Sequence, residues 1–364
     1  MRRLLCVLAV LLTLAFACTC ASAEEPVGSM ALQYAEHFSV DCYSGGAAHL
    51  RAGEQDFLLL PADASVPEGL EKLPRIPIPA QNIYLASSSV PDLFLQMDAL
   101  DAVTFTSTDA PSWRIPEIRE AVVDERVAYI GKYSAPDYEA LLTEGCDLVV
   151  ENTMILHNPA TKEKLEALGF PVLIEYSSYE PHPLGRVEWI RLYGLLCGKQ
   201  AEADAFFDRQ LGTFRSVEGL EPLHKTVAFF HITANGGMVV RRENDYITRM
   251  IELAGAENAV NDLPPSDSAL STVTIQMESF YAQARDADVL IYNSTVAGDV
   301  TDMQSFLSRH PLLGDFKAVK EGNVWCTEMS MFQRSSAAAD MIKELRAAVS
   351  GEAGEELRYL HRIN

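Results

Sequence analysis

The sequence predicts an α/β protein of two lobes, each a mostly parallel sheet flanked by helices, joined by one long rigid helix and separated by a cleft. Three observations support this fold class. The chain has 364 residues, more than one hydrophobic core usually supports. Short apolar strand patterns alternate with helical patterns, which is typical of parallel sheets covered on both faces. A helical stretch interrupts this alternation, which then resumes.

These patterns divide the chain into five parts. They are a signal peptide at 1–23, an N-terminal β element at 24–80, an N-lobe at 81–183, linking helices at 184–218, and a C-lobe with a terminal helix at 219–364.

The N-terminus has the three parts of an export signal. Two arginines at 2–3 precede an apolar run at 4–17, which is too short to span a membrane, and small residues at 21–23 form a cleavage site. We expect cleavage after this site and a periplasmic or other extracytoplasmic location. The alternative is lipid anchoring at Cys18, which the bulky Phe16 disfavours but does not exclude.

The N-terminal half combines a β element with alternating strands and helices. Prolines at 74–79 disfavour a helix in the β element. Pro136 suits a first helical turn, and Gly169 suits a helix end. The predicted strands of the N-lobe are 82–87, 103–107, 126–131, 146–151 and 170–176, and its predicted helices are 90–100, 136–145 and 158–169.

The stretch at 184–217 has a helical pattern throughout. Trp189, Leu192 and Leu196 recur at the spacing of one helix face, and Gly198 separates two helices. The second helix, of about 18 residues, extends roughly 27 Å at about 1.5 Å per residue. A rigid connection of this length predicts only modest closure of the lobes.

The alternation resumes after residue 225. Asn235–Gly237 is a turn signal inside a segment, 231–242, that we assign to a loop. An amphipathic run begins at Glu278. The other predicted strands are 226–232, 286–293 and 322–327, and the other predicted helices are 245–255, 302–314 and 336–349.

Charge and cysteine content exclude some classes of protein. The formal charge of −22 argues against a nucleic-acid partner, because phosphate contacts need Lys and Arg, and we attribute the acidity to solubility. Three of the seven cysteines lie in the signal. The other four form no CxxC pair, which argues against a zinc site or a dense disulfide framework, although a single disulfide stays open in an exported chain. They are Cys42, Cys146, Cys197 and Cys326.

Several local patterns, in this order, resemble one known family. YEALLTEGCDLVV (138–150) is similar to its N-lobe helix–strand unit, with Gly145 and Cys146 replacing a Lys-Pro pair, and MESFYAQARDADVLI (277–291) resembles the C-lobe equivalent. ITRMIELAGAENAV resembles a Leu-Ala-Gly-Gly-x-Asn segment, with Ala256 replacing the second Gly. GNVW and the stretch at 180–199 resemble two further segments.

The family with these patterns is that of the helix-linked substrate-binding proteins of ABC importers, which serve ferric siderophores, haem and cobalamin, with some members taking Zn or Mn. The resemblance covers roughly residues 83–349. It implies a monomeric binding protein without cofactor or catalytic residues. It also implies a small-molecule iron chelate, haem or corrinoid ligand, and an inner-membrane permease with its ATPase as partners. The alternatives are a Zn²⁺ or Mn²⁺ carrier of the same fold and an exported sensor or enzyme component.

The resemblance implies a role for two glutamates. In this family one Glu on each lobe docks onto arginines of the permease, and the matching positions are Glu139 and Glu278. Two carboxylates on two rigid lobes offer a two-point contact with bidentate Arg geometry. The alternative is that each acid only complements the dipole of its helix N-terminus.

Ligand contacts are expected from loops at strand ends that face the ligand cleft between the lobes. Aromatic rings would stack on a macrocycle or catechol, Arg would pair with anionic oxygens, and His or Tyr would ligate iron. For each such residue, packing or surface exposure is the alternative. The candidates are Trp113, Tyr133, His231, Arg241, Arg242, Phe332 and Arg334.

The segment EPHPLGRVE (180–188) has two interpretations. Glu180 and His182 would suit a site in the cleft, whereas the flanking prolines indicate a structured start of a helix, with Arg186 and Glu188 as a surface pair. The sequence leaves both open.

No motif of a known enzyme class is present. The chain has no GxSxG, HExxH, Walker loop or GxGxxG after a strand. The separated histidines His157, His182 and His231 would serve an interlobe Zn or Mn site only if the fold brings them together. We therefore predict a binding protein and assign no metal ligands.

Overall fold

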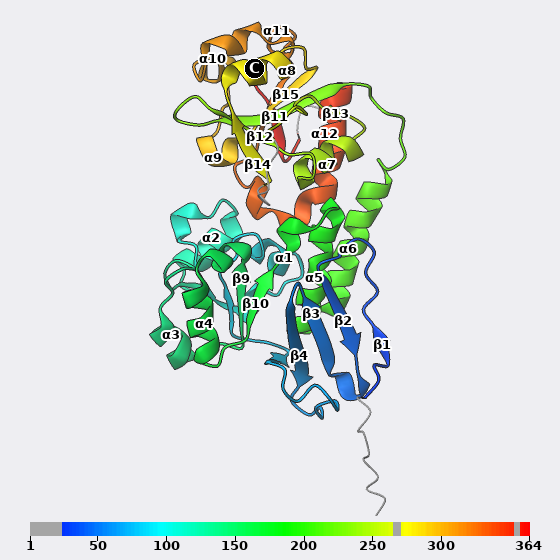
Figure 1. Ribbon diagram of the computed structural model, residues 1–364, viewed down its shortest axis with the longest axis vertical. Coiled ribbons are helices and arrows are strands. Elements are labelled where there is room, and N and C mark those ends of the chain that lie inside the picture. Colours follow the sequence, from blue (N-terminus) through cyan, green and yellow to red (C-terminus); the bar gives the residue numbers. More distant parts are fainter. Residues whose placement is uncertain (1–23, 265–270, 353–356) are drawn as a thin grey trace, which may run out of the picture.

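The computed structural model (Figure 1) describes residues 24–264, 271–352 and 357–364. The predicted signal peptide, with Cys18, lies outside these ranges. Three sheets follow the long axis: the first sheet and the N-lobe at one end, the C-lobe at the other, with α5 and α6 between them. This confirms the predicted two-lobe α/β fold class.

The first sheet has five strands in sequence order, antiparallel except for the parallel pair β4–β5. Alternate residues of β3 are buried, because one face of this sheet packs on the linking helices. The Phe38 and Trp189 rings, for example, lie 4.9 Å apart. The strands are β1 (Gly28–Ser29), β2 (Phe38–Cys42), β3 (Ala48–Ala52), β4 (Gln55–Pro61) and β5 (Arg75–Ile78).

The N-lobe sheet is entirely parallel, in the order β10-β9-β6-β7-β8. The carboxyl ends of its strands therefore share one edge. Its strands are β6 (Ile83–Leu85), β7 (Val103–Thr106), β8 (Ala128–Tyr129), β9 (Leu148–Asn152) and β10 (Val172–Glu175). Its helices are α1 (Pro91–Gln96), α2 (Pro116–Val123), α3 (Tyr138–Glu144) and α4 (Pro159–Ala167).

Two helices connect the lobes: α5 (Pro183–Cys197) and α6 (Gln200–Arg215). Gly198 ends α5 in the left-handed conformation, with φ 70°, as a helix-terminating glycine does. Gly194 permits the close approach of the two helices, since a Cβ there would lie 2.5 Å from the Ala203 Cβ. The second helix, α6, runs from the N-lobe to the C-lobe (Figure 1).

The C-lobe sheet is mixed rather than mostly parallel, in the order β14-β12-β11-β15-β16-β17, with β13 paired to β11. The segment expected to be a loop forms a hairpin instead. The Thr233 N–H donates to the Gly237 carbonyl, the Thr233 hydroxyl accepts the Gly237 N–H, and Gly236 adopts φ 79°. The strands are β11 (Thr226–Ile232), β12 (Met238–Arg241), β13 (Glu257–Asn258), β14 (Thr272–Ile275), β15 (Val289–Tyr292), β16 (Val324–Thr327) and β17 (Leu360–Arg362).

Helices cover both faces of this sheet. On one face α12 packs against α6 and α7, and on the other a separate core gathers α8, α10 and α11. The helices are α7 (Tyr246–Leu253), α8 (Met277–Ala284), α9 (Ser294–Ala297), α10 (Met303–Leu307), α11 (Lys317–Lys320) and α12 (Ala338–Ser350).

One hydrophobic core crosses the boundary between the lobes. It joins Leu50 of the first sheet, Trp189 of α5, Phe207 of α6 and Ile342 of α12. Because packed interiors resist continuous deformation, this shared core supports the modest closure expected from the linking helix.

The four cysteines in the described part of the chain, Cys42, Cys146, Cys197 and Cys326, are free thiols. Within the same ranges, no helix has the length and apolar character needed to cross a membrane.

Candidate ligand and partner sites

The lobes meet through the loop before α2 and the loop after β16. The side chain of Gln333 accepts the backbone N–H of Arg114 at 2.8 Å and donates to the Ser112 carbonyl at 3.0 Å. These two bonds join residues about 220 positions apart in the sequence. Gln333 therefore spans the boundary between the lobes.

A buried carboxylate forms a second contact between the lobes. Asp92, in α1 of the N-lobe, is 0% exposed and accepts the backbone N–H of Ser336 at 2.9 Å. The Arg334 guanidinium lies 3.7 Å from its other oxygen. Burial raises the pKa of Asp92, and the contacts with Ser336 and Arg334 oppose that rise. The candidate Arg334 is thus held at the lobe boundary.

Three further candidates gather beside Arg334 on the C-lobe. Arg241 forms an ion pair with Asp245 at 3.4 Å, and its guanidinium lies 4.9 Å from the Phe332 ring. His231 is buried on β11, the strand paired with β12, which carries Arg241. Burial, together with the nearby Arg241 charge, lowers the pKa of His231. The structure thus brings together His231, Arg241 and Phe332.

The other three candidates lie elsewhere. Trp113 is 1% exposed and donates its indole N–H to the Thr108 carbonyl at 3.1 Å, so its ring presents no face to a ligand in this conformation. Tyr133 is half-buried against the separate core of the N-lobe. Arg242 donates to the Pro264 carbonyl at 3.1 Å.

Glu139 and Glu278 occupy matching positions on the two lobes. Each is exposed in the first turn of its helix, α3 in the N-lobe and α8 in the C-lobe (Figure 1). Asp137 caps α3 by accepting the N–H groups of Glu139 and Ala140, so the Glu139 carboxylate has no capping role. Among the described residues, neither glutamate carboxylate has a hydrogen-bond or ion-pair partner.

Glu180 and Glu188 hold the segment before β2. The Glu188 carboxylate accepts the backbone N–H groups of residues 33–35 at 2.7–3.0 Å, and Glu180 accepts those of residues 36–37 at 2.8 and 3.1 Å. Glu180 also accepts the indole N–H of Trp189 at 2.7 Å. Both carboxylates are buried and satisfied, so of the two interpretations the structural one is correct.

His182 and Arg186 are part of the same structure. The His182 ring packs 4.5 Å from the Tyr34 ring and accepts the N–H of Leu184 as the α5 cap. Burial, with a small contribution from Arg249, lowers the pKa of His182 to about 4. Arg186 is buried, with its guanidinium 4.0 Å from the Tyr246 ring, and does not form the expected surface pair with Glu188.

The three histidines considered for a metal site do not come together. Within the described ranges, no group of ligand atoms close enough to hold one ion includes His157, His182 or His231.

Glu151, at the carboxyl end of β9, was overlooked as a titratable group. It is 0% exposed, and neither carboxylate oxygen has a hydrogen-bond partner. Burial alone raises the pKa of Glu151 to about 8. The sequence showed only an acid at the end of an apolar strand, a pattern that also fits an exposed side chain.

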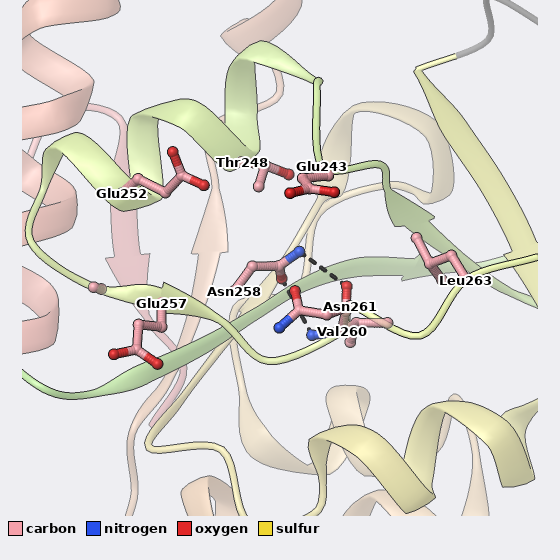
Figure 2. Close-up of a pocket in the computed structure, with 9 residues that line it drawn as sticks. Glu243, Thr248, Glu252, Glu257, Asn258, Val260, Asn261 and Leu263 are labelled. Atoms are coloured by element: carbon pink, nitrogen blue, oxygen red, sulfur yellow. Dashed lines mark hydrogen bonds between the residues drawn. The ribbon is translucent and has the colours of Figure 1, made fainter. Parts of the chain in front are cut away.

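Figure 2 shows a pocket of about 380 Å³ between α7 and the chain that follows β13. Its lining is acidic and polar, without an aromatic ring or a cation, and includes Glu243, which directly follows the candidate Arg242. Its lining residues are Glu243, Thr248, Glu252, Ala256, Glu257, Asn258, Val260, Asn261 and Leu263.

The sequence is similar to two uncharacterized lipoproteins of Methanocaldococcus jannaschii. The first is 23% identical over 262 residues, or 69% of this chain, and the match spans only 60% of that relative's length. The second is 25% identical over 366 residues and covers 94% of this chain and 89% of the relative.

The fold is similar to solved periplasmic binding proteins. One from Veillonella parvula matches with a TM-score of 0.61 at 17% identity, over 86% of this chain and 98% of that chain. A periplasmic heme-binding protein from Pseudomonas aeruginosa matches with a TM-score of 0.59 at 16% identity, over 78% and 98%. At these identities the likeness establishes the fold alone.

The family assignment rests on the sequence. The model of the family described as periplasmic binding protein matches residues 85–328, which include the N-lobe sheet from the end of β6, both linking helices and the C-lobe sheet as far as β16. The chain therefore belongs to the periplasmic binding protein family, whose members bind substrates for transport and are not enzymes.

Proposed function

We propose that this protein captures an iron chelate, or a related haem or corrinoid, outside the cytoplasm and delivers it to the permease and ATPase of an ABC importer. The observation that carries this proposal is the family match across both lobes, residues 85–328. The heme-binding protein of the same fold supports a large, planar, metal-containing ligand.

The residues at the lobe boundary have suitable chemistry for such a ligand. Phe332 offers a half-buried ring with the Arg241 guanidinium 4.9 Å from it, and Arg334 offers a second cation at the lobe boundary. Each arginine already has a carboxylate partner, Asp245 or Asp92, which holds the guanidinium in place. An anionic chelate oxygen or a propionate would add a second acceptor, and guanidinium groups have the donors for both.

Delivery is proposed to use Glu139 and Glu278 as the contacts with the permease. Both carboxylates are exposed and unpartnered, and each is attached to a different lobe. An arginine pair on the permease would bind each carboxylate in bidentate fashion. Because the distance between the two contacts depends on the lobe arrangement, the pair would also report closure.

The lipoprotein relatives support membrane anchoring through Cys18, the alternative to release after residue 23. The mass of the mature N-terminus decides between them: an acylated Cys18 supports anchoring, and a chain that begins at Glu24 supports release.

A thermal-shift panel tests the ligand class. Ferric siderophores, haem, cobalamin, Zn²⁺ and Mn²⁺ are each added to the exported chain. We expect one class of chelate to raise the melting temperature in proportion to the logarithm of its concentration. Stabilisation by a free divalent ion and by none of the chelates would favour the metal-carrier alternative and overturn the chelate proposal.

A further inference from the structure

Three metal-ligating side chains from separate segments of the C-lobe meet beside β16. Cys326 on β16 is the antiparallel partner of His361 on β17, so their side chains share one face of the sheet. Asp299 approaches the same place from the loop after α9. None of these residues belongs to the contacts between the lobes described above.

The distances between their ligand atoms fit a small cation. The His361 Nε2 lies 3.4 Å and the Cys326 Sγ 3.7 Å from the same oxygen of Asp299, and all three atoms lie within 4.8 Å of one another. A tetrahedral Zn²⁺ with Zn–S of about 2.3 Å and Zn–N or Zn–O of about 2.0–2.1 Å places N and O about 3.4 Å apart, and S about 3.6 Å from either. The observed N–O distance of 3.4 Å and S–O distance of 3.7 Å are close to these tetrahedral values.

The surroundings of the His361 ring also indicate a cation. Its Nε2 faces the Val300 carbonyl at 3.0 Å and the Asp299 carboxylate, while its Nδ1 faces the Glu328 carboxylate at 3.5 Å. A neutral imidazole carries one N–H, so it can donate to only one of these two sides. With Nδ1–H directed to Glu328, the Nε2 lone pair is free to face the Asp299 carboxylate, and a cation between these two atoms would bind both. A carboxylate on the distal nitrogen is the usual support for a metal-bound histidine.

We propose that Asp299, Cys326 and His361 form a Zn²⁺-type transition-metal site, with Glu328 as the positioning residue for the His361 ring. One thiolate, one imidazole and one carboxylate favour Zn²⁺ over Mg²⁺ or Ca²⁺, which prefer all-oxygen ligands. Three protein ligands leave the fourth position to water or to a bound molecule.

The charges of the site balance, and the ion can reach it. The Cys326 side chain is buried, whereas His361, Asp299 and Glu328 are 28%, 40% and 48% exposed, which leaves a route from solvent. Binding replaces the thiol proton of Cys326 with the metal and releases that proton to solvent. The resulting thiolate and the Asp299 carboxylate together neutralise the divalent ion. The site would join the C-terminal strand to the rest of the C-lobe.

The experiment uses the exported chain, residues 24–364, freed of metal with a chelator. Co²⁺ is added as a spectroscopic substitute, and Zn²⁺ affinity is measured by calorimetry. We expect a sulfur-to-cobalt charge-transfer band at one equivalent and displacement of Co²⁺ by Zn²⁺. Cys326→Ser should abolish the band, and Glu328→Gln should weaken Zn²⁺ binding about 10–100-fold. Cys146→Ser, which removes a half-buried thiol of the N-lobe, is the matched control and should leave both unchanged.

Either of two other results would contradict the proposed metal site. The absence of a thiolate band in the unmodified protein would show that Cys326 does not bind the ion. Equal Zn²⁺ affinity in the unmodified protein and Cys326→Ser would place the ion elsewhere. If circular dichroism shows that Cys326→Ser does not fold, His361→Gln, at a partly exposed residue, is tested in its place. This variant should likewise lose Zn²⁺ binding. Chelate binding by the Cys326→Ser protein separates this site from the proposed transport function, on which it does not rest.

Discussion

The carboxylate of Glu188 accepts the backbone N–H of Tyr34 at 2.7 Å, which ties α5 to a segment 154 residues earlier in the chain. The same carboxylate accepts the N–H groups of Gln33 and Ala35, and it is 0% exposed. A charged acceptor with several donors is among the stronger polar contacts in a protein interior. This contact fixes the first sheet on the linking helices.

Replacing Glu188 by Ala should therefore destabilise the protein strongly. Three part-buried N–H groups lose their acceptor, and Arg191 loses one of its two carboxylate partners, the other being Asp204. We expect the free energy of unfolding to fall by about 3–5 kcal/mol, as when one partner of a buried charged contact is removed. Urea unfolding followed by circular dichroism measures this. Glu163→Ala, on the exposed face of α4, is the control, and an equal effect of the two substitutions would contradict the assigned role.

The buried Glu151 should make stability depend on pH. Its pKa of about 8 in the folded protein exceeds its ordinary value of 4.5, so between these values only the unfolded chain loses the proton. The contribution of Glu151 to stability is then highest below about pH 4.5 and falls with rising pH by at most about 1.4 kcal/mol per unit, until it levels off near pH 8.

Glu151→Gln removes this titration. The variant should gain stability relative to the unmodified protein as the pH rises from 4.5 to 8, by a few kcal/mol in total. Parallel urea unfolding series at several pH values measure the difference. Glu163→Gln should show no such trend. A constant difference between Glu151→Gln and the unmodified protein across this range would mean that Glu151 is ionised in the fold.

The docking proposal predicts a separation of transport from binding. Glu139→Ala combined with Glu278→Ala should abolish uptake in cells and leave ligand affinity unchanged, because both carboxylates are exposed and unpartnered. Uptake of labelled ligand and calorimetry measure the two quantities. The control removes two other carboxylates: Glu144→Ala, at the last residue of α3, with Asp286→Ala, two residues after the end of α8. Normal transport by the first pair, or equal loss in the control, would refute the assignment.

The Gln333 bridge predicts a change in lobe arrangement. Gln333→Ala removes two hydrogen bonds between the lobes, each worth about 0.5–1.5 kcal/mol, so more open conformations should become populated. Distance distributions between a spin label on each lobe, recorded without ligand, would broaden towards longer values. Gln304→Ala, on the exposed surface of α10, should leave them unchanged. An unaltered distribution in Gln333→Ala would show that the shared core alone sets the arrangement.

Local patterns predicted most of the elements. Strand β10 and helix α7 lie within the predicted ranges, because continuous apolar runs and helical spacing are properties of neighbouring residues. Strand β12 falls in the segment 231–242 that the sequence assigns to a loop, because the turn signal at 235–237 dominates its pattern. The three-residue strand β17 pairs with β16, more than 30 residues earlier in the chain, and its own sequence shows no strand signal.

The sequence by itself determined the order of strands and helices, the two-lobe α/β class and the paired positions of Glu139 and Glu278, because these depend on periodicity and on recognisable segments. Only the tertiary structure decided what the polar residues contact. Glu188 meets Tyr34, Gln333 meets Ser112, and Cys326 meets His361 through folding of the chain. Burial of an acid such as Glu151, and the rise in its pKa, likewise depends on which distant side chains exclude water from it.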